Sequence, residues 1–176
     1  MTDPTPTLNT TAGQTIAREK LIAYLNTGTS SSPSWDALGL RVEDSSMDYD
    51  WGDETKQDIL GNTHTTAKKP VITQSFDPLN LDSGDSAITK IWDIAIREQN
   101  PQALCNQDIL IVHHYGGASA TPFAERYPSS MVKPTGLGGP GGGNIEMPVE
   151  VTYGGKRQTG TASVNSGGTV TFTPAS

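Results

Sequence analysis

The chain has 176 residues, 34% of them hydrophobic, and its 12 basic and 19 acidic residues give a formal net charge of −7. This length suits one domain with a modest core, while 19 glycines and 12 prolines argue against an all-helical protein. An acidic surface repels phosphate, which argues against a protein that grips nucleic acid. The single Cys105 cannot form an internal disulfide, and we interpret it as a buried thiol in a protein that folds in a reducing cytoplasm.

The first 15 residues are rich in Thr, Pro and Asn and are predicted to form a flexible N-terminal arm. They lack the basic start and apolar stretch of a signal peptide. The longest apolar run, Ile109–Val112, has the length of a strand, so we expect no membrane insertion by this chain. Residues 16–176 are expected to form one domain.

Residues 16–25 fit a helix or a strand, and the second half of this segment favours a strand. After a Ser/Thr/Gly-rich loop at 26–34, order resumes at 35–42. In residues 45–51, Met47, Tyr49 and Trp51 alternate with Ser46, Asp48 and Asp50. This period of two predicts a half-buried strand with an apolar side that packs and an acidic side in water.

Residues 52–69 are polar and turn-prone apart from Ile59 and Leu60, and they precede an apolar segment at 70–76 that suggests a returning strand. We therefore expect a long hairpin with an extended polar arm. The period then changes to that of a helix, which begins after the capping sequence at 83–85 and stops at Asn100–Pro101. Its predicted packing face contains Ile88, Ile91, Trp92 and Ala95, and continues to Gln99.

Residues 108–115 form a short apolar run that predicts a central strand buried on both sides. A Gly-rich loop is expected at 134–144, followed by an alternating strand at 144–153, a two-residue turn at Gly154–Gly155, and strands at 156–164 and 169–173. The fold class is mainly β. We expect seven or eight strands in a β-sandwich or partly closed barrel, with one flanking α-helix.

None of the chemical motifs has the context that its chemistry requires. Gly136, Gly138 and Gly141 match G-x-G-x-x-G, but a strand follows them instead of the helix that a dinucleotide site needs. The acidic residues between 48 and 58 fail the calcium-loop spacing. His113 and His114 are adjacent and would point to opposite faces of a strand. Cys105 and the serines lack a nucleophile elbow, so we expect no enzyme, cofactor or metal.

The order and spacing of several segments resemble the major tail tube proteins of long-tailed phages. The resemblance spans residues 20–174 and rests on WDALG at 35–39, DYDW at 48–51, ILG at 59–61, TQSFD at 73–77, the helix, EVTYGG at 150–155, Gly160, and TVTFT at 169–173. It implies a structural subunit that assembles into stacked hexameric rings, in which strands of neighbouring copies close a continuous β-barrel around a channel for double-stranded DNA. The tape-measure protein and tail tip or terminator proteins are the other implied partners, and the location is the virion tail, assembled in the host cytoplasm.

Under this resemblance, the acidic strand face would line the lumen through Ser46, Asp48 and Asp50. The polar arm would contact neighbouring subunits through Asp53, Glu54, Asp58, Ile59, Leu60, Asn62 and His64. Trp35, Trp51 and Trp92 are interpreted as core or interface anchors. Two alternatives stay open: a β-sandwich adhesion or carbohydrate-binding module, and the inner tube protein of a contractile injection machine.

Overall fold

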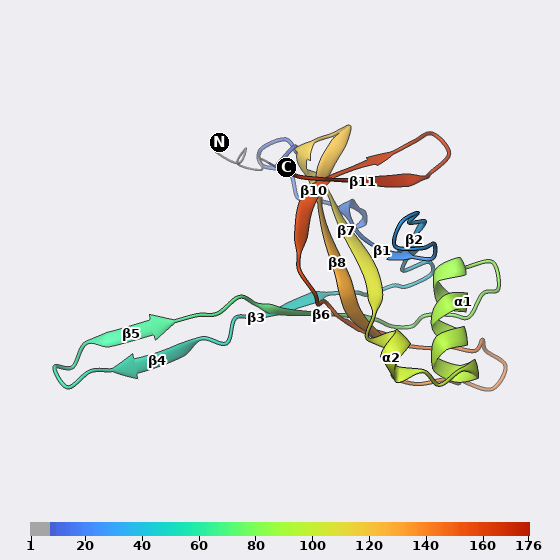
Figure 1. Ribbon diagram of the computed structural model, residues 1–176, viewed down its shortest axis with the longest axis horizontal. Helices are drawn as coiled ribbons and strands as arrows, with labels where there is room; N and C mark the ends of the chain where they lie inside the picture. Colours follow the sequence, from blue (N-terminus) through green and yellow to red (C-terminus); the bar gives the residue numbers. More distant parts are fainter. Residues whose placement is uncertain (1–7) are drawn as a thin grey trace.

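The computed structural model describes residues 8–176 and confirms a mainly β fold with one principal helix (Figure 1). The sheet is open. Within the described residues the strands are β1 Leu21–Asn26, β2 Trp35–Leu38, β3 Met47–Asp50, β4 Glu54–Gln57, β5 Thr63–Thr66, β6 Val71–Phe76, β7 Gln107–Ala118, β8 Thr121–Pro134, β9 Val149–Thr152, β10 Gln158–Val164 and β11 Val170–Pro174. The helical segments are η1 Arg18–Lys20, α1 Ser86–Trp92, η2 Asp93–Arg97 and α2 Pro101–Leu104.

The longest strand, β8, belongs to two layers. Its residues 121–130 pair with β7 and, over 123–126, also with β10. This makes a large layer in the order β2-β1-β7-β8-β10-β11. Residues 131–134 pair instead with β9, which makes a small layer in the order β8-β9-β6-β3. All these pairings are antiparallel. Because β8 belongs to both layers, it fixes the position of one layer relative to the other.

The predicted hairpin turn at Gly154–Gly155 is wrong. β9 and β10 do not pair with each other. β9 lies between β8 and β6, and β10 lies between β8 and β11. The two glycines carry the chain past β8 where it changes layer. A Cβ on Gly154 would lie 2.6 Å from the carbonyl oxygen of Ser129, and Gly155 has a φ of +81°. Glycine is required here by a close backbone approach and not by a two-residue turn.

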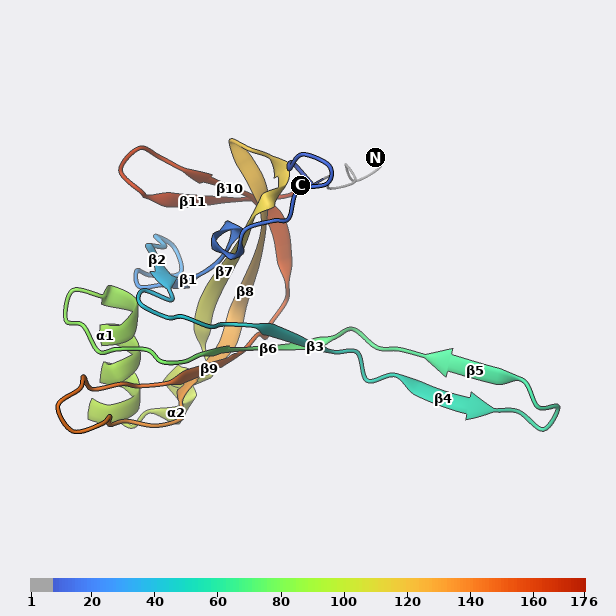
Figure 2. The ribbon, with the colours of Figure 1, turned by 180° about the vertical axis from the view of Figure 1, so that it is seen from behind.

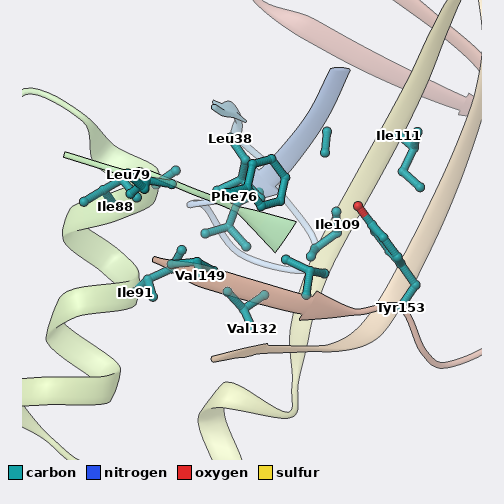
Figure 3. Packing of buried hydrophobic residues seen from close by; sticks show 14 of the residues in the cluster. Leu38, Phe76, Leu79, Ile88, Ile91, Ile109, Ile111, Val132, Val149 and Tyr153 are labelled. Atoms are coloured by element: carbon teal, nitrogen blue, oxygen red, sulfur yellow. The ribbon is translucent and has the colours of Figure 1, made fainter. Parts of the chain in front are cut away.

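The main core lies between the two layers and α1 (Figure 3). Ile109 and Ile111 of β7 meet Phe76 of β6 and Val151 of β9, all of them at most 2% exposed. This confirms that residues 108–115 form a central strand. A second, smaller cluster lies on the opposite face of the large layer, and contains Leu110, Val112, Tyr24, Trp35, Ala124, Ala162 and Val170.

The principal helix begins where the sequence predicts. The side chain of Asp85 accepts a hydrogen bond from the backbone nitrogen of Ile88, at 3.1 Å, and caps α1. Ile88 and Ile91 are buried in the main core, Trp92 packs against it, and Ala95 is half-buried in the wider turns of η2.

The helix ends earlier than its predicted apolar stripe. Gln99 adopts a left-handed φ of +49° and therefore leaves the stripe. Asn100 then caps α2, in which Pro101 occupies the first turn, where its missing N–H costs nothing.

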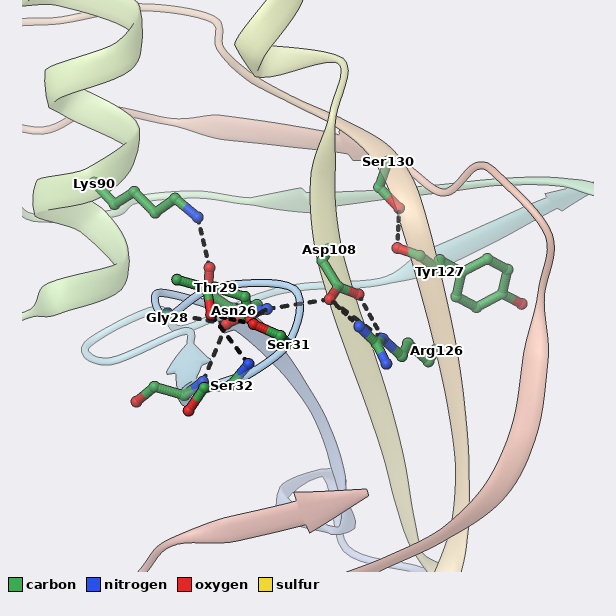
Figure 4. A network of polar contacts seen from close by, with 11 residues as sticks. Asn26, Gly28, Thr29, Ser31, Ser32, Lys90, Asp108, Arg126, Tyr127 and Ser130 are labelled. Carbon is green, nitrogen blue, oxygen red and sulfur yellow. Dashed lines mark hydrogen bonds and ion pairs between the residues drawn. The ribbon is translucent and has the colours of Figure 1, made fainter. Parts of the chain in front are cut away.

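Polar contacts attach the helix to the large layer (Figure 4). Arg126 of β8 binds Asp108 of β7 in a bidentate pair with distances of 2.7 and 2.9 Å. The Asn26 amide nitrogen donates to Asp108 at 3.1 Å, and Lys90 of α1 donates to the Asn26 carbonyl. Burial lowers the pKa of Lys90. The network therefore connects α1 to β1, β7 and β8.

Candidate functional site

The β4–β5 hairpin projects far from the rest of the molecule (Figures 1 and 2). Its register runs from Glu54 opposite Thr66 to Gln57 opposite Thr63, and every residue of both strands is exposed. An isolated two-stranded ribbon is marginally stable in water. We call residues 52–69 the arm.

The tip of the arm is a preformed turn around Asp58. This carboxylate accepts hydrogen bonds from the backbone nitrogens of Leu60 and Asn62, both at 2.9 Å, and from the Asn62 side chain at 3.0 Å. His64 lies 3.2 Å from the same side chain. The Asn62 side chain and backbone, together with the His64 and Leu60 bonds, lower the pKa of Asp58 to about 2. The turn leaves the Ile59 and Leu60 side chains in solvent, 101% and 81% exposed.

The predicted arm residues fall into two groups. Asp58, Asn62 and His64 come together in the turn, with Ile59 and Leu60 projecting from it. Asp53 and Glu54 lie at the base of the arm instead, where Glu54 makes an exposed ion pair with Lys56.

The solvent face of the small layer carries the predicted acidic residues. Asp48 lies opposite Thr73, and Asp50 opposite Val71, on the side away from the core. Further along this face, Glu150 of β9 pairs with Lys133 of β8 at 2.7 Å. Ser46, which precedes β3, is also exposed. This small-layer face is therefore mostly polar, although Val71 on it is 55% exposed, and its lysine is paired with a glutamate.

The expected packing of Tyr49 and Trp51 is wrong for the single chain. They are 44% and 52% exposed and stack on each other with ring centroids 6.3 Å apart. Met47 is half-buried against the core. The alternation is real, but β3 is an edge strand and the core ends near Met47. Among residues 8–176, nothing covers the remaining part of its apolar side.

The small layer has a free edge on each side. β3 pairs with β6 alone, and residues 131–134 of β8 pair with β9 alone, because the pairing with β7 stops at Ser130. In the part of the chain that the structure describes, no other strand covers either edge. Exposed edges carry unpaired N–H and C=O groups that can bind another strand.

A buried carboxylate joins β7, β8 and the segment before β10, and no periodic pattern in the sequence indicated it. Glu125 of β8 lies 2.7 Å from His113, accepts a hydrogen bond from Tyr127 at 2.9 Å, and pairs with Arg157. Burial raises the pKa of Glu125, but the bonds from His113 and Arg157 outweigh it and lower the pKa to about 2. Each carboxylate oxygen has a partner, so this group locks β7, β8 and the start of β10 together.

The other sequence candidates lie apart from these surfaces. The Gly136–Gly141 segment is an exposed loop without a following helix. Cys105 is exposed, which contradicts the expected buried thiol, because it caps the end of the short α2. Between residues 8 and 176, no group of three or more His, Cys, Asp or Glu side chains is arranged to hold a metal ion. Over the same range, none of the helices has the length and apolar character needed to cross a membrane.

Part of the predicted N-terminal arm, residues 1–7, lies outside the described residues. Two of its described residues contact β7: Leu8 forms a bridge with Gly116, and the Asn9 backbone nitrogen donates to the Tyr115 carbonyl at 2.8 Å.

No protein-family model and no curated protein matches the chain. Among solved structures, it is similar to a chain of the PVC sheath–tube complex of an extracellular contractile injection system in its extended state, with 11% identity and a TM-score of 0.49 over 85% of this chain and 94% of that one. It is also similar to the anti-feeding prophage cap, a tube-terminating cap, with 18% identity and a TM-score of 0.48 over 88% of this chain and 96% of that one. A third similar structure is the PVC sheath/tube terminator in its extended state, with 11% identity and a TM-score of 0.48 over 85% of this chain and 99% of that one.

Proposed function

We propose that this chain is the structural subunit of a tail tube, which assembles with copies of itself into stacked rings around a channel. The observation that carries the proposal is the small layer, a four-stranded sheet with a free edge on each side and a polar outer face. The resemblance to phage tail tube proteins, stated from the sequence, supports the same role.

Ring closure would use the two free edges. The β3 edge of one copy would pair with residues 131–134 of the next, a contact between two different surfaces that closes a ring when the rotation allows it. We propose six copies per ring. Closure removes the edges that would otherwise cause uncontrolled aggregation. It would also cover the exposed Tyr49 and Trp51, which lie along the β3 edge.

The channel would be lined by the small-layer face. Asp48 and Asp50 would repeat around it as rings of carboxylate, and the only lysine described on that face, Lys133, is paired with Glu150. Double-stranded DNA could pass without binding, because few unpaired cations would be available to replace its counterions. The tape-measure and tail tip or terminator proteins, the virion tail as location and assembly in the host cytoplasm belong to this proposal.

A carbohydrate-binding module is a second candidate, and the exposed Tyr49–Trp51 stack favours it, since sugar rings pack on aromatic faces. The arm disfavours it, because a free-standing module gains nothing from an unsupported ribbon with an apolar tip. Glycan binding that is lost in Trp51→Ala by a protein that stays monomeric would select this candidate.

Sedimentation velocity over a range of protein concentrations tests the tube. We expect large particles above a threshold concentration, and a monomer at all concentrations would refute it. Asp48→Lys and Asp50→Lys test the lumen separately. Assembly with slowed DNA ejection is expected, because a basic lining binds phosphate. Normal assembly with normal ejection would count against a lumen role, and lost assembly would make this face an interface.

A further inference from the structure

An apolar groove lies at the end of β3 and β6 opposite to the arm. It has a volume of about 440 Å³ and is bounded by β1, β2 and the segment that connects β2 to β3. Leu38, Leu40 and Val42 contribute apolar surface, and Leu40 is 56% exposed. Arg18 stands at the groove, where its guanidinium donates to the Ser45 carbonyl at 2.8 and 3.1 Å.

The arm and the groove occupy opposite ends of one strand pair. β3 begins just after Ser45 at the groove and leads into the arm, and β6 returns from the arm and ends at Phe76, which lines the groove. The arm points away from β1, β2 and α1 in both views (Figures 1 and 2). A chain therefore cannot place its own arm tip in its own groove, so an arm tip that binds there must belong to another copy.

We propose that Ile59 and Leu60 at the arm tip of one copy occupy this groove in the copy that follows it along the tube axis. The inference rests on the proposed tube and names the contact that stacks its rings. The tip offers two aliphatic side chains on a turn that is already ordered, and the groove offers an apolar lining of matching chemistry. A protrusion and a socket at opposite ends of a subunit produce open-ended growth.

Two pairs of opposite charge can form between the arm and the groove. Asp58 lies directly behind the tip, and among residues 8–176 no carboxylate pairs with Arg18 at the groove. On the arm shaft, Lys56 could face Glu43, which also lines the groove. The groove presents Arg18 together with Glu19 and Glu43, so a seated tip can place Asp58 opposite Arg18 and Lys56 opposite Glu43.

One such contact is too small to hold two copies together. Two aliphatic side chains bury far less than the roughly 1,200–2,000 Å² of a stable protein interface. Repetition around a ring multiplies the contact, because each further arm binds at high effective concentration. We therefore expect no free dimers held by the arm, and cooperative stacking once rings exist.

Cysteine cross-linking tests the contact directly. In a Cys105→Ser background, Leu60→Cys and Leu40→Cys are placed in one chain, and the protein is oxidised under assembling conditions. The matched control replaces Leu40→Cys by Leu137→Cys, which is similarly exposed, at 50%, but lies outside the groove. We expect a ladder of covalent multimers for the 60–40 pair and none for the 60–137 pair, because a disulfide needs close Cα atoms.

A second measurement uses uncross-linked protein. Leu60→Asp should raise the concentration needed for assembly by roughly tenfold or more, the factor that follows from losing the burial of one aliphatic side chain. Thr63→Asp on the arm shaft should change it little. Tubes without the 60–40 ladder, or with a 60–137 ladder, would overturn the groove assignment and leave the tube intact. Wild-type protein that never assembles would overturn the proposed function itself.

Discussion

Glu125→Gln is expected to destabilise the chain by an amount that depends on pH. The pKa of Glu125 lies at about 2, against 4.5 for an unperturbed group, and the carboxylate is 5% exposed as part of a bonded cluster with His113, Tyr127 and Arg157. The difference in pKa corresponds to about 3 kcal/mol of folding free energy at neutral pH. Gln cannot supply this charge, and it leaves Arg157 without its anion.

The sign of the pH effect follows from the lowered pKa. A carboxyl group with a depressed pKa in the folded state stabilises fully above its unfolded pKa, and the stabilisation is lost as the pH falls through the folded value. The gap between wild type and Glu125→Gln should therefore be about 3 kcal/mol at pH 7 and shrink to about 1 kcal/mol at pH 3.

Urea unfolding of dilute, unassembled protein between pH 3 and 7 measures this gap. Glu150→Gln is the matched control, because Glu150 makes an ion pair with Lys133 in which both side chains are about 40% exposed. Such a surface pair contributes about 1 kcal/mol or less. A gap for Glu125→Gln that is absent at pH 7, or that stays constant down to pH 3, would refute the account of the buried cluster.

Three further changes test the core, the helix and the arm. Phe76→Ala, at a side chain that is 2% exposed in the main core, should cost about 3–5 kcal/mol of unfolding free energy in urea, and a loss below half of that would show that the site collapses. Asp85→Ala removes the α1 cap and should cost about 1 kcal/mol by the same measurement, while Asp85→Asn should retain most of the stability. Asp58→Ala should speed amide hydrogen exchange at Leu60 and Asn62 without moving the urea midpoint, and unchanged exchange would mean that the turn does not depend on this carboxylate.

Periodicity predicted the elements whose packing is simple. The buried run at 109–112 indicated β7, the 3.6-residue stripe indicated α1, and alternation located β3 and β9. In α1, β3 and β9 the sequence spacing defines one apolar face, and in β7 the continuous apolar run buries both faces. The strand at 21–26 was favoured over a helix, and the structure confirms it.

The strand β8 was not predicted because its burial does not follow polarity. Glu125 and Ser130 are both at most 5% exposed, and prolines occupy positions 122, 128 and 134. Its buried polar groups are satisfied by partners far away in sequence, such as Arg157. Local pattern contains no information about those partners.

The exposure of the predicted surface residues could be foreseen only where one strand decides the geometry. The alternation in β3 assigned its acidic side, but not how far the core extends, and Tyr49 and Trp51 therefore turned out exposed. The turn around Asp58 depends on bonds over two to six residues, which composition alone could not order. The second free edge, at 131–134, exists only because β7 ends its pairing at Ser130.

A cryo-electron microscopy reconstruction of the protein, concentrated until it assembles, tests the central claim most directly. We expect a hollow tube whose inner wall contains four strands from each copy, with β3 of one copy paired to residues 131–134 of the next and with Asp48 and Asp50 facing the channel. A protein that stays monomeric at high concentration, or a tube in which the small layer faces outward, would contradict the account.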